Sequence, residues 1–216
     1  IEKTWKKRVI DLYSANTPNG KKISIMLEEI GFDYKVIKVD INNGEQFKDE
    51  FKKISPLSKI PVIIDHKNKK TVFESGAILI YLAELSEKFY NSEERLEINQ
   101  WLMAQMGYVG PMLGQHHQFH HYNPGKSKFG EERYFKISKR IYKELDERLS
   151  KSKYLSGDNY TIADIGTFPW IARHEWHDIG LKNYKNLTRW YNEISKRDAV
   201  IKGFSFMNKN ELPPIA

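Results

Sequence analysis

The sequence predicts two domains, an α/β domain followed by an all-α domain. Strand and helix patterns alternate through the first part of the chain, only helical patterns follow, and a polar stretch at residues 86–94 separates the two parts. The 216 residues are enough for two buried cores. We therefore expect an N-terminal extension at residues 1–8, an α/β domain at 9–86 and a helical domain at 93–216.

The first elements form a strand–helix–strand unit. Residues 9–13 are a short apolar strand, and a turn at 17–20 leads into a helix that ends at Gly31. Apolar side chains recur at helical spacing between residues 23 and 30, and residues 34–40 alternate like a second strand. The two strands should therefore be parallel and joined by a right-handed crossover.

A hairpin completes the first domain. Apolar runs at 60–65 and 71–73 flank a polar stretch, which predicts two antiparallel strands. A short helix is expected over 47–54, and a longer one begins at Glu74 and Ser75. This order of elements is the thioredoxin-like arrangement, so the predicted fold is an α/β thioredoxin-like N-terminal domain followed by an all-α C-terminal domain.

The second part shows helical periodicity at 98–105 and 134–145, with a loop rich in Gly, Pro and His expected between them. Thr161 and Asp164 have the spacing of a capping box, in which each side chain accepts a hydrogen bond from the main chain of the other. We therefore assign Asp164 to folding rather than to catalysis.

The composition excludes several kinds of site and makes several kinds of partner unexpected. The chain has no Cys, which excludes disulfides, thiolate metal sites and a cysteine nucleophile of its own. The net charge is +7, but the 35 basic residues are scattered among 28 acidic ones, so nucleic acid is not an expected partner. No run of 18 apolar residues occurs, and the first residues contain no apolar leader. We expect no membrane association and a cytoplasmic location.

Several motifs in a fixed order carry a resemblance to a known family. They are Ser55–Pro56, Lys59–Ile60–Pro61, the run from Phe73 to Ile78, and Thr161–Asp164. Together they resemble the glutathione S-transferase superfamily over nearly the whole chain. Residues 17–20, 44–47 and 110–115 further resemble the nu-class members, which are glutathione-dependent disulfide-bond reductases.

The resemblance implies a site for glutathione. Ser75, at a helix start, would hold the γ-glutamyl carboxylate, and Glu74 would take the ammonium group. Ile60, before a proline expected to be cis, would pair with the cysteinyl main chain like an added strand. Without the other motifs, Glu74 and Ser75 would be read as a plain helix cap.

Three further residues are placed by the resemblance alone. It implies that Gln46 and Lys59 lie near the glycyl and γ-glutamyl ends of the tripeptide. It also implies that Arg133 reaches bound glutathione from the helical domain. Two alternatives stay open: Lys59 as a solvated surface lysine, and Arg133 as a surface arginine paired with neighbouring glutamates.

Two sets of residues compete for the contact with the glutathione sulfur. Many superfamily members use a side chain just after the first strand, where this chain has Tyr13 and Ser14. The nu-class pattern implies instead that Thr17 and Asn19 donate to the sulfur and are the catalytic residues. Lowering a thiol pKa by two units takes about 2.7 kcal/mol, and hydrogen bonds to a charged sulfur supply about 1.5 to 3 kcal/mol each. A third alternative is a turn without a chemical role.

A histidine-rich segment at 115–121 stands apart from these motifs. His116 and His120, like His117 and His121, have the spacing of a helical metal-binding pair. No carboxylate lies within the segment, so no metal is predicted, and we expect these side chains to give a polar lining to a cleft.

The predicted function is reduction of small disulfides with the thiol of glutathione, and the expected cosubstrate is glutathione, bound in its reduced form or, as the product of exchange, in its oxidised form. Since the chain has no Cys, the reactive sulfur must come from glutathione. The alternatives are a conjugating transferase acting on electrophiles, a peroxidase, or a non-catalytic interaction module of the same fold. The resemblance also implies a homodimer.

Overall fold

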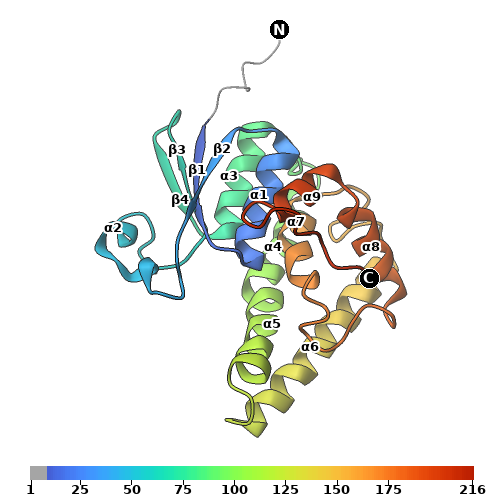
Figure 1. The fold of residues 1–216 in the computed structure, drawn as a ribbon. Coiled ribbons are helices and arrows are strands. Elements are labelled where there is room, and N and C mark those ends of the chain that lie inside the picture. Colours follow the sequence, from blue (N-terminus) through green and yellow to red (C-terminus); the bar gives the residue numbers. More distant parts are fainter. Residues whose placement is uncertain (1–8) are drawn as a thin grey trace. The chain divides into compact units, whose positions relative to one another are not determined.

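In the computed structural model, which describes residues 9–216, the chain divides into two compact units (Figure 1). Of the described residues, the first unit contains 9–88 and Arg197–Leu212, and the second contains Phe89–Lys196 and Pro213–Ala216. The predicted extension at 1–8 lies outside the described residues. The predicted boundaries, 9–86 and 93–216, do not anticipate that residues 197–212 belong with the first unit.

The first unit is built on a four-stranded sheet with the order β2-β1-β3-β4. Its strands are β1 (Ile10–Ser14), β2 (Tyr34–Lys38), β3 (Val62–Asp65) and β4 (Lys70–Phe73). β1 and β2 are parallel, whereas β3 is antiparallel to both β1 and β4. The predicted parallel pair and the predicted hairpin are both confirmed.

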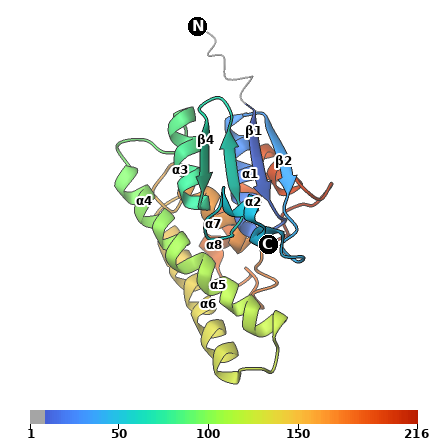
Figure 2. The ribbon, with the colours of Figure 1, turned by 90° about the vertical axis from the view of Figure 1, so that its left-hand side faces the viewer.

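Helices cover the sheet on both sides. α1 (Pro18–Ile30) and α3 (Ser75–Ser86) lie on one side, and the short helices η2 (Glu45–Phe47) and α2 (Asp49–Lys52) lie on the other (Figure 2). The buried side chains of β1 alternate with partly exposed ones, because successive residues of a strand point to opposite faces. α1 ends at Gly31, whose φ of 72° is the expected left-handed cap.

Residues 197–212 pack onto α1. Within this segment, α9 (Asp198–Phe204) contacts α1 along its length. The Arg197 guanidinium donates to both oxygens of Glu29 at 2.6 and 2.8 Å, and Ser24 Oγ donates to the main-chain oxygen of Gly203 at 2.6 Å. This bidentate pair ties a distant segment of the chain to the helix that begins at the predicted sulfur site.

The second unit is entirely helical. It contains α4 (Arg95–Ala104), η3 (Gln105–Val109), α5 (Gly110–His116), η4 (His117–Tyr122), α6 (Lys128–Leu149), α7 (Ile162–Ile171) and α8 (Lys185–Ser195). The capping box at Thr161 and Asp164 is confirmed, and buried Asp164 also accepts from Trp190 Nε1 at 2.8 Å. Its assignment to folding is consistent with these contacts.

The loop expected before residue 128 is largely wrong. Residues 105–122 are helical, with π-helical turns at η3 and η4, and only 123–127 connect to α6. Gly114 lies within this helical stretch, close to the Trp170 ring: a Cβ at this position would lie 3.2 Å from the ring. The glycine permits close packing, which outweighs its poor helix propensity.

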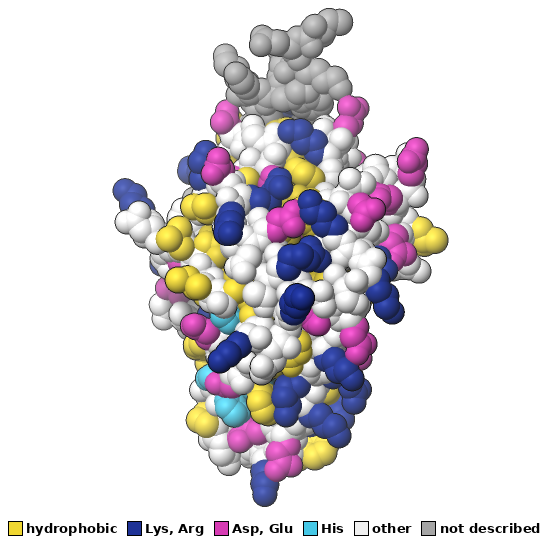
Figure 3. Space-filling model, turned by 90° about the vertical axis from the view of Figure 1, so that its right-hand side faces the viewer, with side chains coloured by type: hydrophobic (Ala, Val, Ile, Leu, Met, Phe, Trp, Pro, Cys, Tyr) yellow, Lys and Arg dark blue, Asp and Glu magenta, His cyan; other side chains and the backbone are white. Residues whose placement is uncertain are grey.

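The surface agrees with the composition. Figure 3 shows Lys and Arg side chains interspersed with Asp and Glu over the visible surface rather than gathered into one field. Within residues 9–216, none of the helices combines the length and the apolar character needed to cross a bilayer.

Candidate functional site

The N-terminus of α3 has the features of an anion site. Ser75 is the first residue of the helix and is 4% exposed, and Glu74 precedes it with an exposed side chain. The first main-chain N–H groups of a helix have no partner within the helix and carry partial positive charge. The structure therefore brings the two residues predicted for the γ-glutamyl group together at one helix end.

A buried lysine supports this helix end from α1. Lys22 is 1% exposed, and its Nζ lies 3.2 Å from Ser75 Oγ. Burial lowers the pKa of Lys22 to about 7, and the nearby Glu74 carboxylate partly offsets that shift. Because Lys22 donates to Ser75 Oγ, the hydroxyl proton of Ser75 is directed away from Lys22.

Lys22 is the residue that the sequence motifs missed. It lies one helical turn before Met26, which is fully buried on the apolar face of α1. A lysine on the buried face of a helix is unusual, because lysine side chains are rarely buried without a partner. This position on the apolar face is the sequence signal that could have identified Lys22. Its partner Ser75 lies 53 residues further along the chain, so no local motif connects them.

Hydrogen bonds from Ser55 fix the main chain next to Ile60. Ser55 Oγ accepts from the Lys59 N–H at 3.0 Å and donates to the Lys59 oxygen at 2.7 Å. Within residues 9–216, neither the N–H nor the C=O of Ile60 has a hydrogen-bond partner. The Ile60–Pro61 peptide bond is cis, as expected. A residue with both main-chain groups free is able to pair with an extended peptide.

Gln46 and Lys59 differ in their surroundings. Gln46, on η2, donates from Nε2 to the Ile41 oxygen at 3.2 Å, while its Oε1 is buried without a hydrogen-bond partner. Such an acceptor is costly unless a ligand or water satisfies it. The Lys59 side chain is exposed, so it is also compatible with a solvated surface lysine.

Thr17 caps α1 with its hydroxyl. Thr17 Oγ1 accepts from the Gly20 N–H at 3.1 Å, and both Thr17 and Asn19 are partly exposed. Because a hydroxyl has one proton besides its acceptor lone pairs, this cap leaves the Thr17 proton available for another group. Asn19 lies in the first turn of the helix, where main-chain N–H groups point outward from the helix end.

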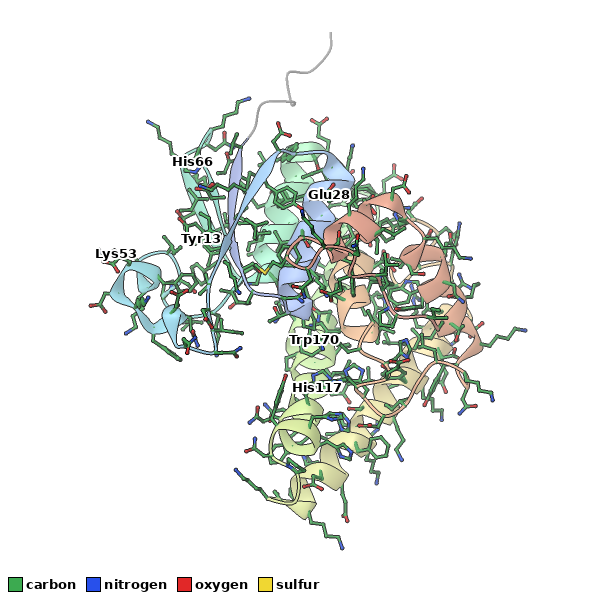
Figure 4. The ribbon with its side chains drawn as sticks, viewed as in Figure 1. Tyr13, Glu28, Lys53, His66, His117 and Trp170 are labelled. Atoms are coloured by element: carbon green, nitrogen blue, oxygen red, sulfur yellow. The ribbon has the colours of Figure 1, made fainter. Side chains whose placement is uncertain are left out.

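Of the two rival sulfur contacts, Ser14 is less accessible than Thr17 and Asn19, whereas Tyr13 is partly exposed like them. Ser14 is fully buried, and its hydroxyl donates to the Ala15 oxygen at 3.2 Å. A Cβ at Gly20 would lie 2.4 Å from Ser14 Oγ, so the first turn of α1 closes directly over that hydroxyl. The Tyr13 ring, labelled in Figure 4, packs against Phe51 of α2 at 6.5 Å between centroids.

Arg133 lies in a basic hollow of the second unit. The cavity has a volume of about 520 Å³, and Arg133, Lys136 and Arg140 of α6 share it with Tyr108 and Met112. The three basic side chains follow one face of the helix at spacings of three and four residues. Glu132 also lines the cavity, but three cations outnumber it, so the hollow suits an anionic ligand.

The histidines of the second unit form a network with aromatic rings. His117 stacks on His177 at 4.7 Å and lies beside Trp170 at 6.1 Å (Figure 4). Tyr142 Oη lies 2.7 Å from His177 Nδ1. Burial, aided by the charge of Arg173, lowers the pKa of His117 to about 3, so this ring stays neutral.

Two family models match the chain. The model for the N-terminal domain of glutathione S-transferase matches residues 8–84, and the model for the C-terminal domain of glutathione S-transferase matches residues 115–198. Among curated proteins, the disulfide-bond oxidoreductase YfcG of Escherichia coli is 46% identical, over 89% of this chain and 93% of that protein. YghU of the same organism, also a disulfide-bond oxidoreductase, is 37% identical, over 91% of this chain and 74% of that protein.

Solved structures agree with this result. A glutathione transferase from Burkholderia graminis, with two glutathione molecules per subunit, has a TM-score of 0.85 and 38% identity, covering 92% of this chain and 88% of its own. A glutathione transferase from Pseudomonas putida, with one glutathione disulfide per subunit, has a TM-score of 0.85 and 36% identity, covering 96% of this chain and 94% of its own.

Proposed function

The chain belongs to the glutathione S-transferase family, and on that premise we propose that it is an enzyme that reduces disulfides with the thiol of bound glutathione. A chain without Cys has no thiol of its own to exchange with a disulfide. Two relatives named as disulfide-bond oxidoreductases, at 46% and 37% identity, support disulfide reduction over conjugation.

The N-terminus of α3 carries the proposal. We assign the γ-glutamyl carboxylate to Ser75 and to the first main-chain N–H groups of the helix, and the ammonium group to Glu74. Lys22 orients the Ser75 hydroxyl and adds positive charge behind it, so it is a positioning residue rather than a contact. Both charged ends of an amino acid are thus matched within two adjacent residues.

The rest of the tripeptide is assigned to main-chain and amide groups. Ile60 would pair through its free N–H and C=O with the cysteinyl residue. The buried Oε1 of Gln46 would accept one donor from the peptide, and Lys59 would pair with a carboxylate. Free main-chain groups and an unsatisfied buried acceptor fit a bound peptide better than they fit an isolated fold.

Thr17 and Asn19 are assigned to the sulfur. When bound, glutathione supplies a thiolate that displaces one sulfur of a disulfide, and a second glutathione thiol releases the other, so one disulfide is reduced as one glutathione disulfide forms. The Thr17 hydroxyl and the first turn of α1 lower the pKa of that thiol by donating to its sulfur. No side chain is required as a general base.

Arg133 is assigned to a carboxylate of glutathione. Its hollow, shared with Lys136 and Arg140, has cations to pair with the anionic ends of a tripeptide. From the resemblance we further propose a nu-class enzyme that acts as a cytoplasmic homodimer.

A coupled assay tests the proposal. The purified chain, glutathione, 2-hydroxyethyl disulfide, glutathione reductase and NADPH are mixed, and NADPH oxidation is followed. We expect turnover well above the rate without the chain. No turnover here, with conversion of chlorodinitrobenzene or cumene hydroperoxide instead, would assign the chain to conjugation or peroxide reduction. Retention on glutathione resin without any turnover would indicate a binding module.

A further inference from the structure

The histidine-rich segment gains a carboxylate in the folded chain. Asp178 lies 62 residues after His116, and its Oδ2 is 3.1 Å from His116 Nε2 and 3.5 Å from His120 Nε2. His121 Nε2 lies 3.0 Å from the same oxygen. Three imidazole nitrogens therefore converge on one carboxylate oxygen, and none of these four residues is assigned to glutathione.

We propose that His116, His120 and Asp178 bind a divalent transition metal, with Zn²⁺ as the probe ion. The three ligand atoms all lie within 4.8 Å of one another. In a tetrahedral site with bonds of about 2.0 to 2.2 Å, ligand atoms are about 3.3 to 3.6 Å apart. The 3.1 and 3.5 Å separations from Asp178 are close to that range, so small side-chain movements are enough to admit an ion.

The donor set selects the kind of ion. Two imidazoles and one carboxylate suit zinc and its neighbours, whereas Mg²⁺ and Ca²⁺ prefer shells made mainly of oxygen. The chain has no Cys, so no thiolate competes for the ion elsewhere. The remaining coordination position is open to water, since His121 Nε2 also lies 2.6 Å from the Trp176 main-chain oxygen.

Aromatic packing fixes the ligand rings before an ion binds. The His116 ring stacks on Phe135 of α6 at 5.4 Å and on His120 at 4.9 Å. The His121 ring stacks on Trp176 at 4.7 Å. Rings that are already oriented lose little conformational freedom when they bind a metal.

Exposure gives the ion access to the cluster. The His116 side chain is fully buried, but those of His120 and Asp178 are 40% and 39% exposed. His116 Nδ1 is buried without a hydrogen-bond partner, and metal-binding histidines usually donate from that position. We therefore expect an affinity about 10- to 100-fold weaker than that of a site with this second hydrogen bond.

The test is a zinc titration of the full chain after it has been stripped with a chelator, in competition with a chromophoric chelator. We expect one Zn²⁺ per chain, no binding of Mg²⁺ under the same conditions, and a higher unfolding temperature with zinc. Asp178→Asn keeps the shape of the side chain and removes its charge, and His120→Asn removes one imidazole. Each variant should weaken zinc binding at least about tenfold.

His66→Asn is the matched control. His66 Nε2 lies 2.8 Å from Asp11 Oδ2 in the first unit, so it is a histidine–carboxylate pair outside the proposed site. Its substitution should leave zinc binding unchanged. No stoichiometric zinc, or equal losses in all three variants, would overturn the proposal and show an adventitious ion only. The coupled disulfide assay is also run on Asp178→Asn without added metal. Because Asp178 is not assigned to glutathione, the rate of disulfide reduction should stay unchanged, so a failure of the zinc site can be told from a failure of the proposed function.

Discussion

The residues assigned to glutathione in the first unit and the histidine–aspartate cluster in the second are built from different parts of the chain. The first set combines two helix N-termini and the main-chain groups of Ile60 with the hydroxyls of Ser75 and Thr17, which lie at those helix ends. The cluster consists of side chains alone, held by stacking and by one carboxylate. A site made of main-chain groups should tolerate many substitutions, whereas a site made of side chains should fail when one is lost.

The largest effect is expected where the first site does depend on a side chain. Ser75→Ala removes a hydrogen bond to a charged carboxylate, worth about 1.5 to 3 kcal/mol, so glutathione affinity should fall about 10- to 150-fold. Calorimetric titration measures it. The control is Ser86→Ala, at the other end of α3, where the hydroxyl donates only to main-chain oxygens. Unchanged affinity in Ser75→Ala would remove Ser75 from the site.

The next effect concerns the sulfur. Thr17→Ala removes the hydroxyl proposed to donate to the thiolate, so the rate of disulfide reduction at pH 7 should fall about tenfold and the pH–rate profile should move about one unit higher. Thr17→Ser keeps a hydroxyl and should restore most of the rate. Thr17→Ala also loses the N-cap of α1, which lowers the free energy of unfolding by about 1 kcal/mol, and urea unfolding measures that loss separately. A profile in the same place would assign the sulfur to another residue.

The buried Lys22 should make the free energy of unfolding depend on pH. Its folded-state pKa of about 7 lies below the ordinary lysine pKa of 10.5, so between these values the unfolded chain holds a proton that the folded chain has released. The free energy of unfolding should therefore rise as pH increases from about 7 toward 10, and Lys22→Met should weaken that rise. Urea unfolding across this pH range measures it, with Lys35→Met, an exposed position on β2, as control.

The same substitution tests the positioning role. Without Lys22 the Ser75 hydroxyl loses the donor that orients it, so Lys22→Met should weaken glutathione binding severalfold while Lys35→Met leaves it unchanged. A variant that loses the pH dependence of stability but binds glutathione normally would show that Lys22 is buried without a role in the site.

The smallest effect on glutathione affinity is expected at Ile60, where the main chain rather than the side chain is assigned to the peptide. Ile60→Val leaves the main-chain N–H and C=O in place, so glutathione affinity should stay within about twofold. Calorimetry under the conditions used for Ser75→Ala makes the two directly comparable. A tenfold loss in Ile60→Val would mean that the side chain, not the main chain, recognises the peptide.

Local patterns explain what the sequence could predict. The hairpin of β3 and β4, the capping box at Thr161 and the placement of Glu74 and Ser75 at a helix start all depend on residues close together in the sequence. The contacts of Lys22 with Ser75 and of His116 with Asp178 join residues 53 and 62 positions apart, so only the folded chain reveals them. The helical stretch at 105–122 was obscured for a related reason, since close packing of Gly110 and Gly114 on Trp170 outweighs their poor helix propensity.

The most direct test of the central claim is the ionisation of the glutathione thiol on the protein. Thiolate absorbance in the ultraviolet is followed against pH with the chain in excess over glutathione, and compared with free glutathione. The chain itself has no thiol to interfere. A pKa about one to two units below that of the free tripeptide, restored toward the free value in Thr17→Ala, is the predicted result. An identical pKa for bound and free glutathione would contradict the account.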